Sequence, residues 1–289
     1  MDPAPHALTL PLRRIPAPER WFLAALDALT RCEIPWVRRL LIRSFISIFG
    51  VDLNEAAESD PDRYPHFNAF FTRALKAGAR TPAPPPCLSS PVDGTLVSLG
   101  VASPSGLVSV KGVRFSWHGL IGPSVPEAGL FNPQAYFFNC YLAPRNYHRV
   151  HMPDAGRLIR AEWIPGRFRS VRPDRVARHP EILAGNERVL LTFATRHGPL
   201  LLILVAARLV GGIETPWCPA RLAWRDTGQS FHEALASGVG TAFGRGDEIG
   251  RFNYGSSVLV IAPRAIWKPL HETGTLLVGE ALARPEMAS

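Results

Sequence analysis

The chain has 289 residues, of which 46% are hydrophobic, and this content supports a folded core rather than a disordered chain. It carries 32 Lys and Arg against 24 Asp and Glu, which gives a net charge of +8. Such a charge favours polyanions, either nucleic acid or an anionic lipid surface, and does not choose between them. Four scattered cysteines without a Cys-x-x-Cys pair exclude a zinc ribbon and a redox dithiol, and we expect them to be reduced.

No apolar run approaches the roughly 18 to 20 residues that a membrane-spanning helix needs. The longest extends from Pro199 to Ala207. Near the N-terminus, Arg13 and Arg14 are not followed by an apolar block and a small-residue cleavage site, so we predict no secretory signal. The chain is therefore expected to remain on the cytoplasmic side.

Residues 18 to 50 carry the strongest helical pattern and predict two amphipathic helices separated by Pro35. Trp21 and Phe22 lie on the apolar side of the first helix, and Trp36 and Phe45 on that of the second. Aromatic side chains opposite arginines are typical of a helix that lies in a lipid headgroup layer. The alternative is a helical pair packed on the protein's own core. The arginines are Arg20, Arg31, Arg38, Arg39 and Arg43.

A third, short helix is predicted from Phe67 to Lys76, and the proline-rich residues 81–86 after it cannot continue a helix. From Leu96 onward, short apolar runs separated by Gly and Pro predict β-strands. This order predicts an α+β fold, with N-terminal helices before a mainly antiparallel, sandwich-like or barrel-like body. No dinucleotide-binding or Walker-type loop occurs. The predicted strands are 96–101, 107–110, 135–142, 158–164, 189–194, 200–205 and 258–262.

Two histidines, His148 and His151, follow the strand that is predicted to end at Leu142. Because the ordinary pKa of histidine lies near neutrality, such a pair can divide the duties of base and acid. His-x-x-His also occurs in metal sites, but no cluster of carboxylates or cysteines accompanies it here, so we predict no metal. An ordinary turn pair is the remaining interpretation.

A carboxylate, Asp93, lies in the turn Pro91-Val92-Asp93-Gly94 before a predicted strand. Asp-Gly is a favoured turn pair, which gives a purely structural interpretation. In the functional interpretation, the carboxylate bonds one ring nitrogen of a histidine and fixes its tautomer, so that the other nitrogen can take a proton from a serine.

The serine for such a triad is Ser256, which follows Gly255 at the start of a predicted strand. Gly and Ser are common turn residues, so the pair alone is a weak signal. Its hydroxyl could nevertheless attack the Gly255 carbonyl and rearrange the peptide bond to an ester, whose elimination would turn the serine into a pyruvoyl ketone. Asp93, His151 and Ser256 would then form a triad that acts on its own chain.

Several motifs occur in one order along the chain, and together they resemble those of bacterial phosphatidylserine decarboxylases, pyruvoyl enzymes that process themselves and make phosphatidylethanolamine. The resemblance covers most of the sequence. Tyr254 and Ser257 stand where this family usually has Leu and Thr at the processing site, and Gly212 stands where a serine is usual. The motifs lie at residues 67–73, 90–94, 111–112, 144–153, 186–189, 210–215 and 248–257, and the stretch 147–153 is the most specific.

The resemblance implies that a proenzyme cleaves itself between Gly255 and Ser256 into a large chain, 1–255, and a small chain, 256–289. Ser256 would become a covalent pyruvoyl group, which replaces pyridoxal as the electron sink and forms a Schiff base with phosphatidylserine. His151 would be the base for Ser256, and Asp93 would orient it. His148 would protonate the product or hold the substrate carboxylate.

The resemblance also implies a division into residues 1–86, a membrane-docking region with its connector, and residues 87–289, a β-rich catalytic domain. Trp21, Phe22, Trp36 and Phe45 would contact the lipid. The partner would be phosphatidylserine in an anionic membrane surface rather than nucleic acid, and the protein would be peripheral on the cytoplasmic face of the inner membrane. A homodimer is left open.

Two other functions fit parts of the sequence. A Ser/His/Asp hydrolase could act on external esters or peptides, although the chain lacks a Gly-x-Ser-x-Gly elbow. A peripheral lipid-binding protein without enzymatic activity would use only the basic helices, and Ser256 would then have no role.

Overall fold

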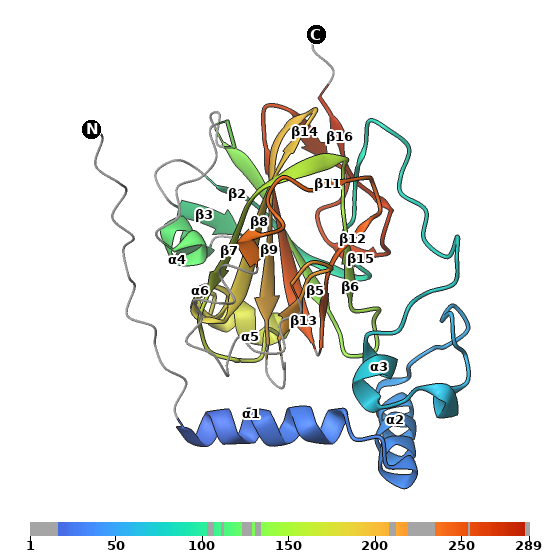
Figure 1. The fold of residues 1–289 in the computed structure, drawn as a ribbon. Helices are drawn as coiled ribbons and strands as arrows, with labels where there is room; N and C mark the ends of the chain where they lie inside the picture. Colours follow the sequence, from blue (N-terminus) through green and yellow to red (C-terminus); the bar gives the residue numbers. More distant parts are fainter. Residues whose placement is uncertain are drawn as a thin grey trace.

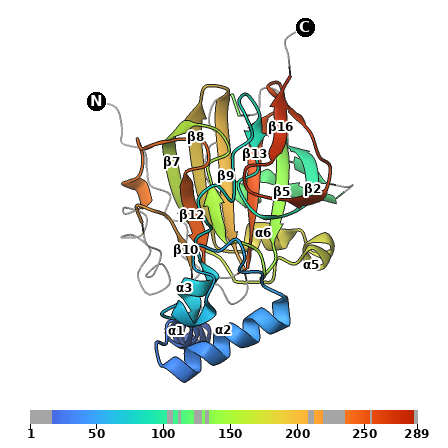
Figure 2. The ribbon, with the colours of Figure 1, turned by 90° about the vertical axis from the view of Figure 1, so that its right-hand side faces the viewer.

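The protein is an α+β molecule in which N-terminal helices lie beneath one end of a β-rich body (Figures 1 and 2). This computed structural model describes residues 17–102, 107–110, 113–122, 129–130, 134–207, 212–218, 235–253 and 255–286. Within them, no helix is both long and apolar enough to cross a bilayer.

The two predicted N-terminal helices are present as α1 (Ala17–Thr30) and α2 (Pro35–Phe49). Pro35 begins α2, where its missing N–H costs no intrahelical hydrogen bond. Gly50 ends α2 in the left-handed region, with φ of 63°, and donates its N–H to the Ile46 carbonyl. A short 3-10 helix (Pro61–Arg63) follows.

The third predicted helix is shorter than expected: α3 covers Phe67–Phe71 and does not reach Lys76. The Lys76 N–H bonds the Glu55 carbonyl at 2.8 Å, and the Ala57 N–H bonds the Ala74 carbonyl at 2.9 Å. Residues 74–76 therefore use their backbone groups in pairing with an earlier extended segment rather than in a helix. The helical prediction over 72–76 was wrong, because the local sequence does not show that these residues pair with a segment about 20 residues earlier.

The described strands form one large antiparallel sheet and two small ones, and all seven predicted strands are confirmed. The large sheet is open, so the described strands do not close a barrel. Its order is β11 (Ala242–Phe243), β7 (Gly156–Ile164), β8 (Arg188–Thr195), β9 (Gly198–Ala206), β13 (Ser256–Pro263), β5 (Ala135–Leu142), β2 (Gly94–Ala102), β3 (Leu107–Val110) and β4 (Val113–Ser116), with β15 (Gly274–Leu276) beside β2.

The two small sheets have three strands each in the described chain. One has the order β10 (Ile213–Glu214), β12 (Glu248–Phe252) and β6 (Arg149–His151). The other has the order β1 (Leu88–Ser89), β16 (Ala281–Pro285) and β14 (Trp267–Pro269). Short helices α4 (Trp117–Ile121), α5 (Pro173–Arg178) and α6 (Glu181–Gly185) lie beside the large sheet (Figure 1).

Strand β13 forms the centre of the core. It pairs with β5 on one side and β9 on the other, and each of its eight residues is buried. The sheet with β12 packs closely over β9, because a Cβ added at Gly250 would lie 2.9 Å from Leu204 Cδ2. This packing brings β12, whose Glu248 pairs with His151, over the strands around Ser256.

Candidate active site

Ser256 is the first residue of β13 and lies in register between Leu142 of β5 and Ala206 of β9. Its side chain is fully buried, and its hydroxyl has no hydrogen-bond partner among the described residues. A buried polar atom usually has a partner, so an orphaned one marks a functional group or strain. Gly255 precedes it and is half-buried, whereas Tyr254 lies outside the described residues.

The register shows which way Ser256 faces. Leu204 of β9 faces β12, since it lies under Gly250. Ala206 is two residues further along the strand, so its side chain is on the same face, and Ser256 is its direct cross-strand partner. The Ser256 hydroxyl therefore points into the space between the large sheet and the sheet of β10, β12 and β6.

His148 is completely buried and packs against Phe71 of α3, with ring centroids 4.1 Å apart. Its Nδ1 lies 2.8 Å from the Asn146 carbonyl, which can only accept, so Nδ1 carries the proton. Nε2 has no partner in the described structure. Burial, with a smaller contribution from the charge of Arg73, lowers the pKa of His148 to about 3 although the bond to Asn146 opposes the shift, so the ring is neutral at physiological pH with Nε2 as an unoccupied acceptor.

His151 lies at the end of β6, with its ring partly exposed. Its Nδ1 is 2.7 Å from the Gly246 carbonyl, which assigns the proton to Nδ1, and its Nε2 accepts from the Tyr147 hydroxyl at 2.9 Å. Burial lowers the pKa of His151, whereas the Gly246 carbonyl and the charges of Glu248 and Asp93 raise it. In this arrangement a backbone carbonyl fixes the tautomer, the task that the sequence assigned to Asp93.

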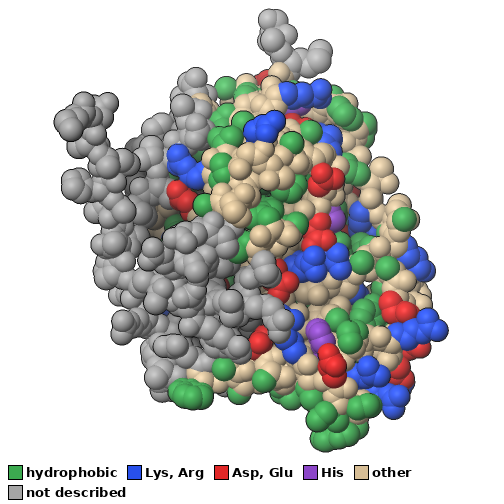
Figure 3. Space-filling view, in the orientation of Figure 1, with side chains coloured by type: hydrophobic (Ala, Val, Ile, Leu, Met, Phe, Trp, Pro, Cys, Tyr) green, Lys and Arg blue, Asp and Glu red, His purple; other side chains and the backbone are tan. Residues whose placement is uncertain are grey.

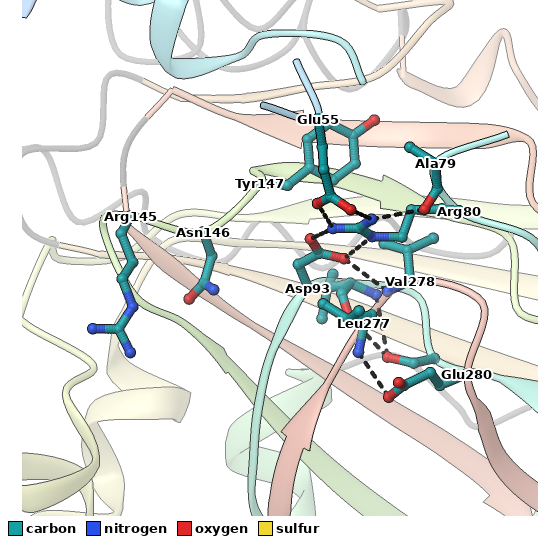
Figure 4. A network of polar contacts seen from close by, with 12 residues as sticks. Glu55, Ala79, Arg80, Asp93, Arg145, Asn146, Tyr147, Leu277, Val278 and Glu280 are labelled. Carbon is teal, nitrogen blue, oxygen red and sulfur yellow. Dashed lines mark hydrogen bonds and ion pairs between the residues drawn. The ribbon is translucent and has the colours of Figure 1, made fainter. Parts of the chain in front are cut away.

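Asp93 is buried before β2, and its carboxylate is held by groups other than His151 (Figure 4). Arg80 donates to both carboxylate oxygens, at 2.9 and 2.7 Å, and the Val278 N–H donates at 2.8 Å. Its charge nevertheless acts on His151 and on Tyr147, whose pKa burial raises to about 12. The structure therefore gathers Asp93 and His151 into one neighbourhood without a direct hydrogen bond between them.

An apolar groove with a cavity volume of about 670 Å³ runs between the N-terminal helices and the β body and reaches Gly255. Phe71, which also packs on His148, lines the same groove. The groove thus runs past the phenyl ring that covers the buried imidazole and extends from the helices to the glycine before Ser256. It is lined by Leu26, Leu29, Thr30, Leu40, Leu41, Ser44, Phe45, Ile48, Phe49, Phe67, Phe71, Tyr141, Pro144, Ser170, Val171, Arg172, Ala207 and Gly255.

The helices also present apolar side chains to solvent. Trp21 is 77% exposed and Trp36 is 69% exposed, and hydrophobic side chains gather along the lower edge of the molecule (Figure 3). Phe45 instead packs against the rings of Phe67 and Phe71, with centroids 5.1 and 5.7 Å apart, and so belongs to the groove. The Phe22 side chain lies outside the described part of the chain.

The arginines of these helices also fall into two groups, one exposed to solvent and one bonded to other parts of the protein. Arg39 and Arg43 are exposed and pair with Asp62, at 3.8 and 2.8 Å. Arg31 instead pairs inward, with Asp27 and Glu214, and Arg38 donates to a backbone carbonyl. The Arg20 side chain lies outside the described residues. Two of the four described arginines therefore remain on the outer surface.

Among the described residues, no group of three or more His, Cys, Asp or Glu side chains is arranged to hold a metal ion. Sequence reasoning missed three groups of the site: Arg80, which holds Asp93, and Tyr147 and Gly246, which bond His151. Tyr147 lies in the same short motif as both histidines, and this closeness in sequence could have indicated that it contacts one of them. Nothing local marked Arg80 or Gly246.

Comparison with known proteins identifies the class. A family model described as phosphatidylserine decarboxylase matches residues 67–284. The chain belongs to the phosphatidylserine decarboxylase family, which confirms the resemblance seen in the motifs.

The relatives are similar over nearly their whole length. The chain is 38% identical over 270 residues to the phosphatidylserine decarboxylase proenzyme of Xylella fastidiosa (strain M12), covering 92% of this chain and 91% of the relative. It is 39% identical over 275 residues to that of Xanthomonas campestris pv. campestris (strain B100), with 94% and 96% covered. It is 39% identical over 254 residues to that of Marinobacter nauticus, with 86% and 88% covered.

Proposed function

We propose that this chain is a proenzyme that cleaves itself between Gly255 and Ser256 and then decarboxylates phosphatidylserine to phosphatidylethanolamine and carbon dioxide. The observation that carries the proposal is the buried Ser256 hydroxyl, which has no partner among the described residues and directly follows Gly255 at an apolar groove. Membership of the family supplies the substrate and the reaction. Neither an external hydrolase nor a non-enzymatic lipid-binding protein accounts for both the buried Ser256 hydroxyl and the family membership.

Cleavage would proceed by rearrangement and elimination. Ser256 Oγ attacks the Gly255 carbonyl and loses its proton, and the peptide C–N bond breaks, which leaves an ester and a free Ser256 amine. Loss of the Ser256 α-proton then breaks the Cβ–Oγ bond and releases Gly255 as a carboxylate. Water replaces the nitrogen of the resulting enamine and ammonia leaves, so that residue 256 ends as a pyruvoyl ketone.

His151 is the proposed base for Ser256, and Asp93 is the proposed carboxylate that supports it. The Nδ1 proton on His151 leaves Nε2 as the basic nitrogen, which would exchange the Tyr147 hydroxyl for the serine proton. The negative charge of Asp93 raises the pKa of His151 and so favours the imidazolium that forms.

His148 is the proposed proton carrier for the decarboxylation. The open Nε2 of its neutral ring can take a proton from the substrate ammonium, but burial lowers its pKa to about 3, so it is a weak base that gives the proton up readily. The same nitrogen would return that proton to the substrate carbon after carbon dioxide leaves. Its contact with Phe71 keeps the ring beside the groove and away from water.

The pyruvoyl group would supply a carbonyl that condenses with the substrate amine and accepts the electrons released with carbon dioxide. Residue 256 suits it, because the side chain is buried among apolar strands and its oxygen is not tied to any described group. The small chain, 256–289, would remain bound through β13, which pairs with strands of the large chain on both sides.

The groove and the exposed helices suit a lipid substrate. Trp21 and Trp36 would enter the headgroup layer with Arg39 and Arg43 beside them, and the acyl chains would lie along the apolar groove that ends at Gly255. The protein would then be peripheral on the cytoplasmic face of the inner membrane, facing anionic lipid.

We also propose that residues 1–86 form the docking region with its connector and residues 87–289 the catalytic domain. The boundary is tied at several points, since the Ala83 N–H bonds the Gly279 carbonyl and Arg80 bonds Asp93. Residues 80–86 would therefore be a connector held against the β body rather than a flexible linker.

Intact-mass measurement tests the proposal. The wild-type protein is expected to give two chains, 1–255 and 256–289, in place of the single 31.7 kDa precursor, and borohydride should modify the N-terminus of the small chain. Ser256→Ala and His151→Ala should remain single chains, whereas His148→Ala should be cleaved but release no carbon dioxide from phosphatidylserine. An intact and active wild-type chain would falsify the proposal. If His148→Ala stayed uncleaved while His151→Ala were cleaved but inactive, the roles of the two histidines would be exchanged.

A further inference from the structure

We propose that Arg80 is a positioning residue for self-processing, which holds the Asp93 carboxylate in place, and that Glu55 holds Arg80 in turn. The inference rests on the proposed self-cleavage and concerns residues that the motifs of the site do not include.

The contact between Arg80 and Asp93 is a two-bond ion pair in a buried position. Nε lies 2.9 Å from Oδ1 and Nη2 lies 2.7 Å from Oδ2, and the two side chains are 11% and 6% exposed. Such a fork fixes both the position and the plane of a carboxylate, which one point charge cannot do. The Val278 N–H adds a third bond to the carboxylate, at 2.8 Å.

Glu55 fixes the other side of the same guanidinium (Figure 4). Arg80 Nη1 bonds Glu55 Oε1 at 3.0 Å and the Ala79 carbonyl at 2.7 Å, and Nη2 bonds Glu55 Oε2 at 2.8 Å. With the two bonds to Asp93, the five N–H donors of the arginine all have acceptors. The guanidinium therefore cannot turn toward another group without losing a bond.

The charges explain why this matters for the reaction. A buried carboxylate without partners is costly, and one that could change rotamer would not keep its negative charge at a fixed place relative to His151. Arg80 holds the carboxylate in one orientation, and Glu55 offsets the charge of the arginine, so that the three ionised side chains carry a net charge of −1. The other titratable groups influenced by Asp93 are Arg73, Tyr147 and His151.

The three side chains come from separate parts of the chain. Glu55 follows α2, Arg80 follows α3, and Asp93 precedes β2, while Val278 belongs to the segment that would become the small chain. The network therefore links the end of the helical region to the residue that would support cleavage. The position of this network explains how Arg80, which lies outside the processing motifs, could affect the rate of cleavage.

The test follows cleavage of freshly translated precursor by intact mass over time. Arg80→Ala is expected to slow cleavage by about tenfold or more, which corresponds to about 1.4 kcal/mol of barrier. Added guanidinium ion should restore part of the rate to Arg80→Ala, while urea at the same concentration, a neutral molecule of similar shape, should not. Arg80→Lys should fall between the wild type and Arg80→Ala. Arg178→Ala, which removes an exposed arginine paired with Asp174, is the matched control and should process like the wild type.

Three outcomes separate the possibilities. Wild-type processing by a folded Arg80→Ala, or slow processing that neither guanidinium nor Arg80→Lys improves, would overturn the positioning role. If Arg80→Ala fails to fold, Arg80→Lys and Glu55→Gln replace it: slower cleavage in both supports the role, and wild-type rates in both overturn it. A wild-type chain that is never cleaved would instead overturn the proposed function.

Discussion

Glu187 is a fully buried carboxyl group that the proposed chemistry does not use. Burial raises its pKa to about 7, although a hydrogen bond from Trp163 opposes the shift. Between the unfolded value of 4.5 and about 7, the folded chain holds a proton that the unfolded chain has released. The free energy of unfolding should therefore fall as the pH rises through this window, by up to about 3 kcal/mol.

Urea unfolding of the uncleaved Ser256→Ala protein at several pH values measures this effect, with Ser256→Ala/Glu187→Gln as the comparison. The difference between the two proteins isolates Glu187, because the lowered pKa of His148 acts in the opposite direction and is common to both. Equal pH dependence in the two proteins would show that the carboxyl is not protonated in the folded state.

At the level of single residues, the sequence predicted which side chains matter better than it predicted their partners. Ser256, His148, His151 and Asp93 were all predicted from motifs, and their roles stay a prediction; in the structure Ser256, His148 and Asp93 are buried and His151 is partly buried. The bond from His151 to Gly246 could not be predicted, because any backbone carbonyl can accept and only the folded turn brings this one within 2.7 Å.

Among the elements, β13 should determine how firmly the two chains hold together. Leu259 is fully buried and pairs with Asn139 on one side and Ile203 on the other. Leu259→Ala should lower the free energy of unfolding by about 2–5 kcal/mol, through lost burial and the cavity left behind. Urea unfolding in the Ser256→Ala background measures it. Leu277→Ala, at a 39% exposed position, should cost far less, and a similar loss at both positions would contradict the role of β13.

Helices α1 and α2 should attach the protein to lipid through their exposed tryptophans. Trp21→Ser/Trp36→Ser should weaken sedimentation with phosphatidylserine-containing vesicles by about tenfold or more and leave the thermal unfolding temperature nearly unchanged, because both side chains are already largely exposed. Leu270→Ser removes an exposed apolar side chain from the β body, at 42% exposure, and serves as the control. Equal binding by both proteins would remove the helices from the docking surface.

The elements themselves were largely readable from the sequence. Apolar runs punctuated by Gly and Pro predicted seven strands of the large sheet, since their residues are buried on long stretches and turn residues separate them. The nine other described strands have only two to five residues, mostly too few for such a pattern, and were not predicted. The excess length predicted for α3 shows the limit of local pattern. Residues 74–76 have helical propensity, but their backbone groups pair with residues 55–57 instead.

At the scale of the whole molecule, the apolar groove had no sequence signal, because its lining comes from three helices and from a strand and loops of the β body. Phe45 illustrates the difficulty: its spacing placed it on the apolar face of a helix, but only the fold shows that this face turns toward Phe67 and Phe71. Where the helices sit on the body determines which aromatic residues line the groove and which remain exposed.

The net charge of +8 should make membrane attachment depend on salt. Raising sodium chloride from about 0.05 M to about 0.5 M shortens the screening length and should weaken binding to phosphatidylserine-containing vesicles, since each basic residue near the surface contributes about 1 kcal/mol. Binding to neutral phosphatidylcholine vesicles should be weaker and change little, because the tryptophans alone would carry it. Cleavage at Gly255 should be unaffected by the same salt, since Ser256 is completely buried. Vesicle sedimentation and intact mass on the same samples separate the two effects, and salt-independent binding to anionic vesicles would mean that apolar contact alone holds the protein on the membrane.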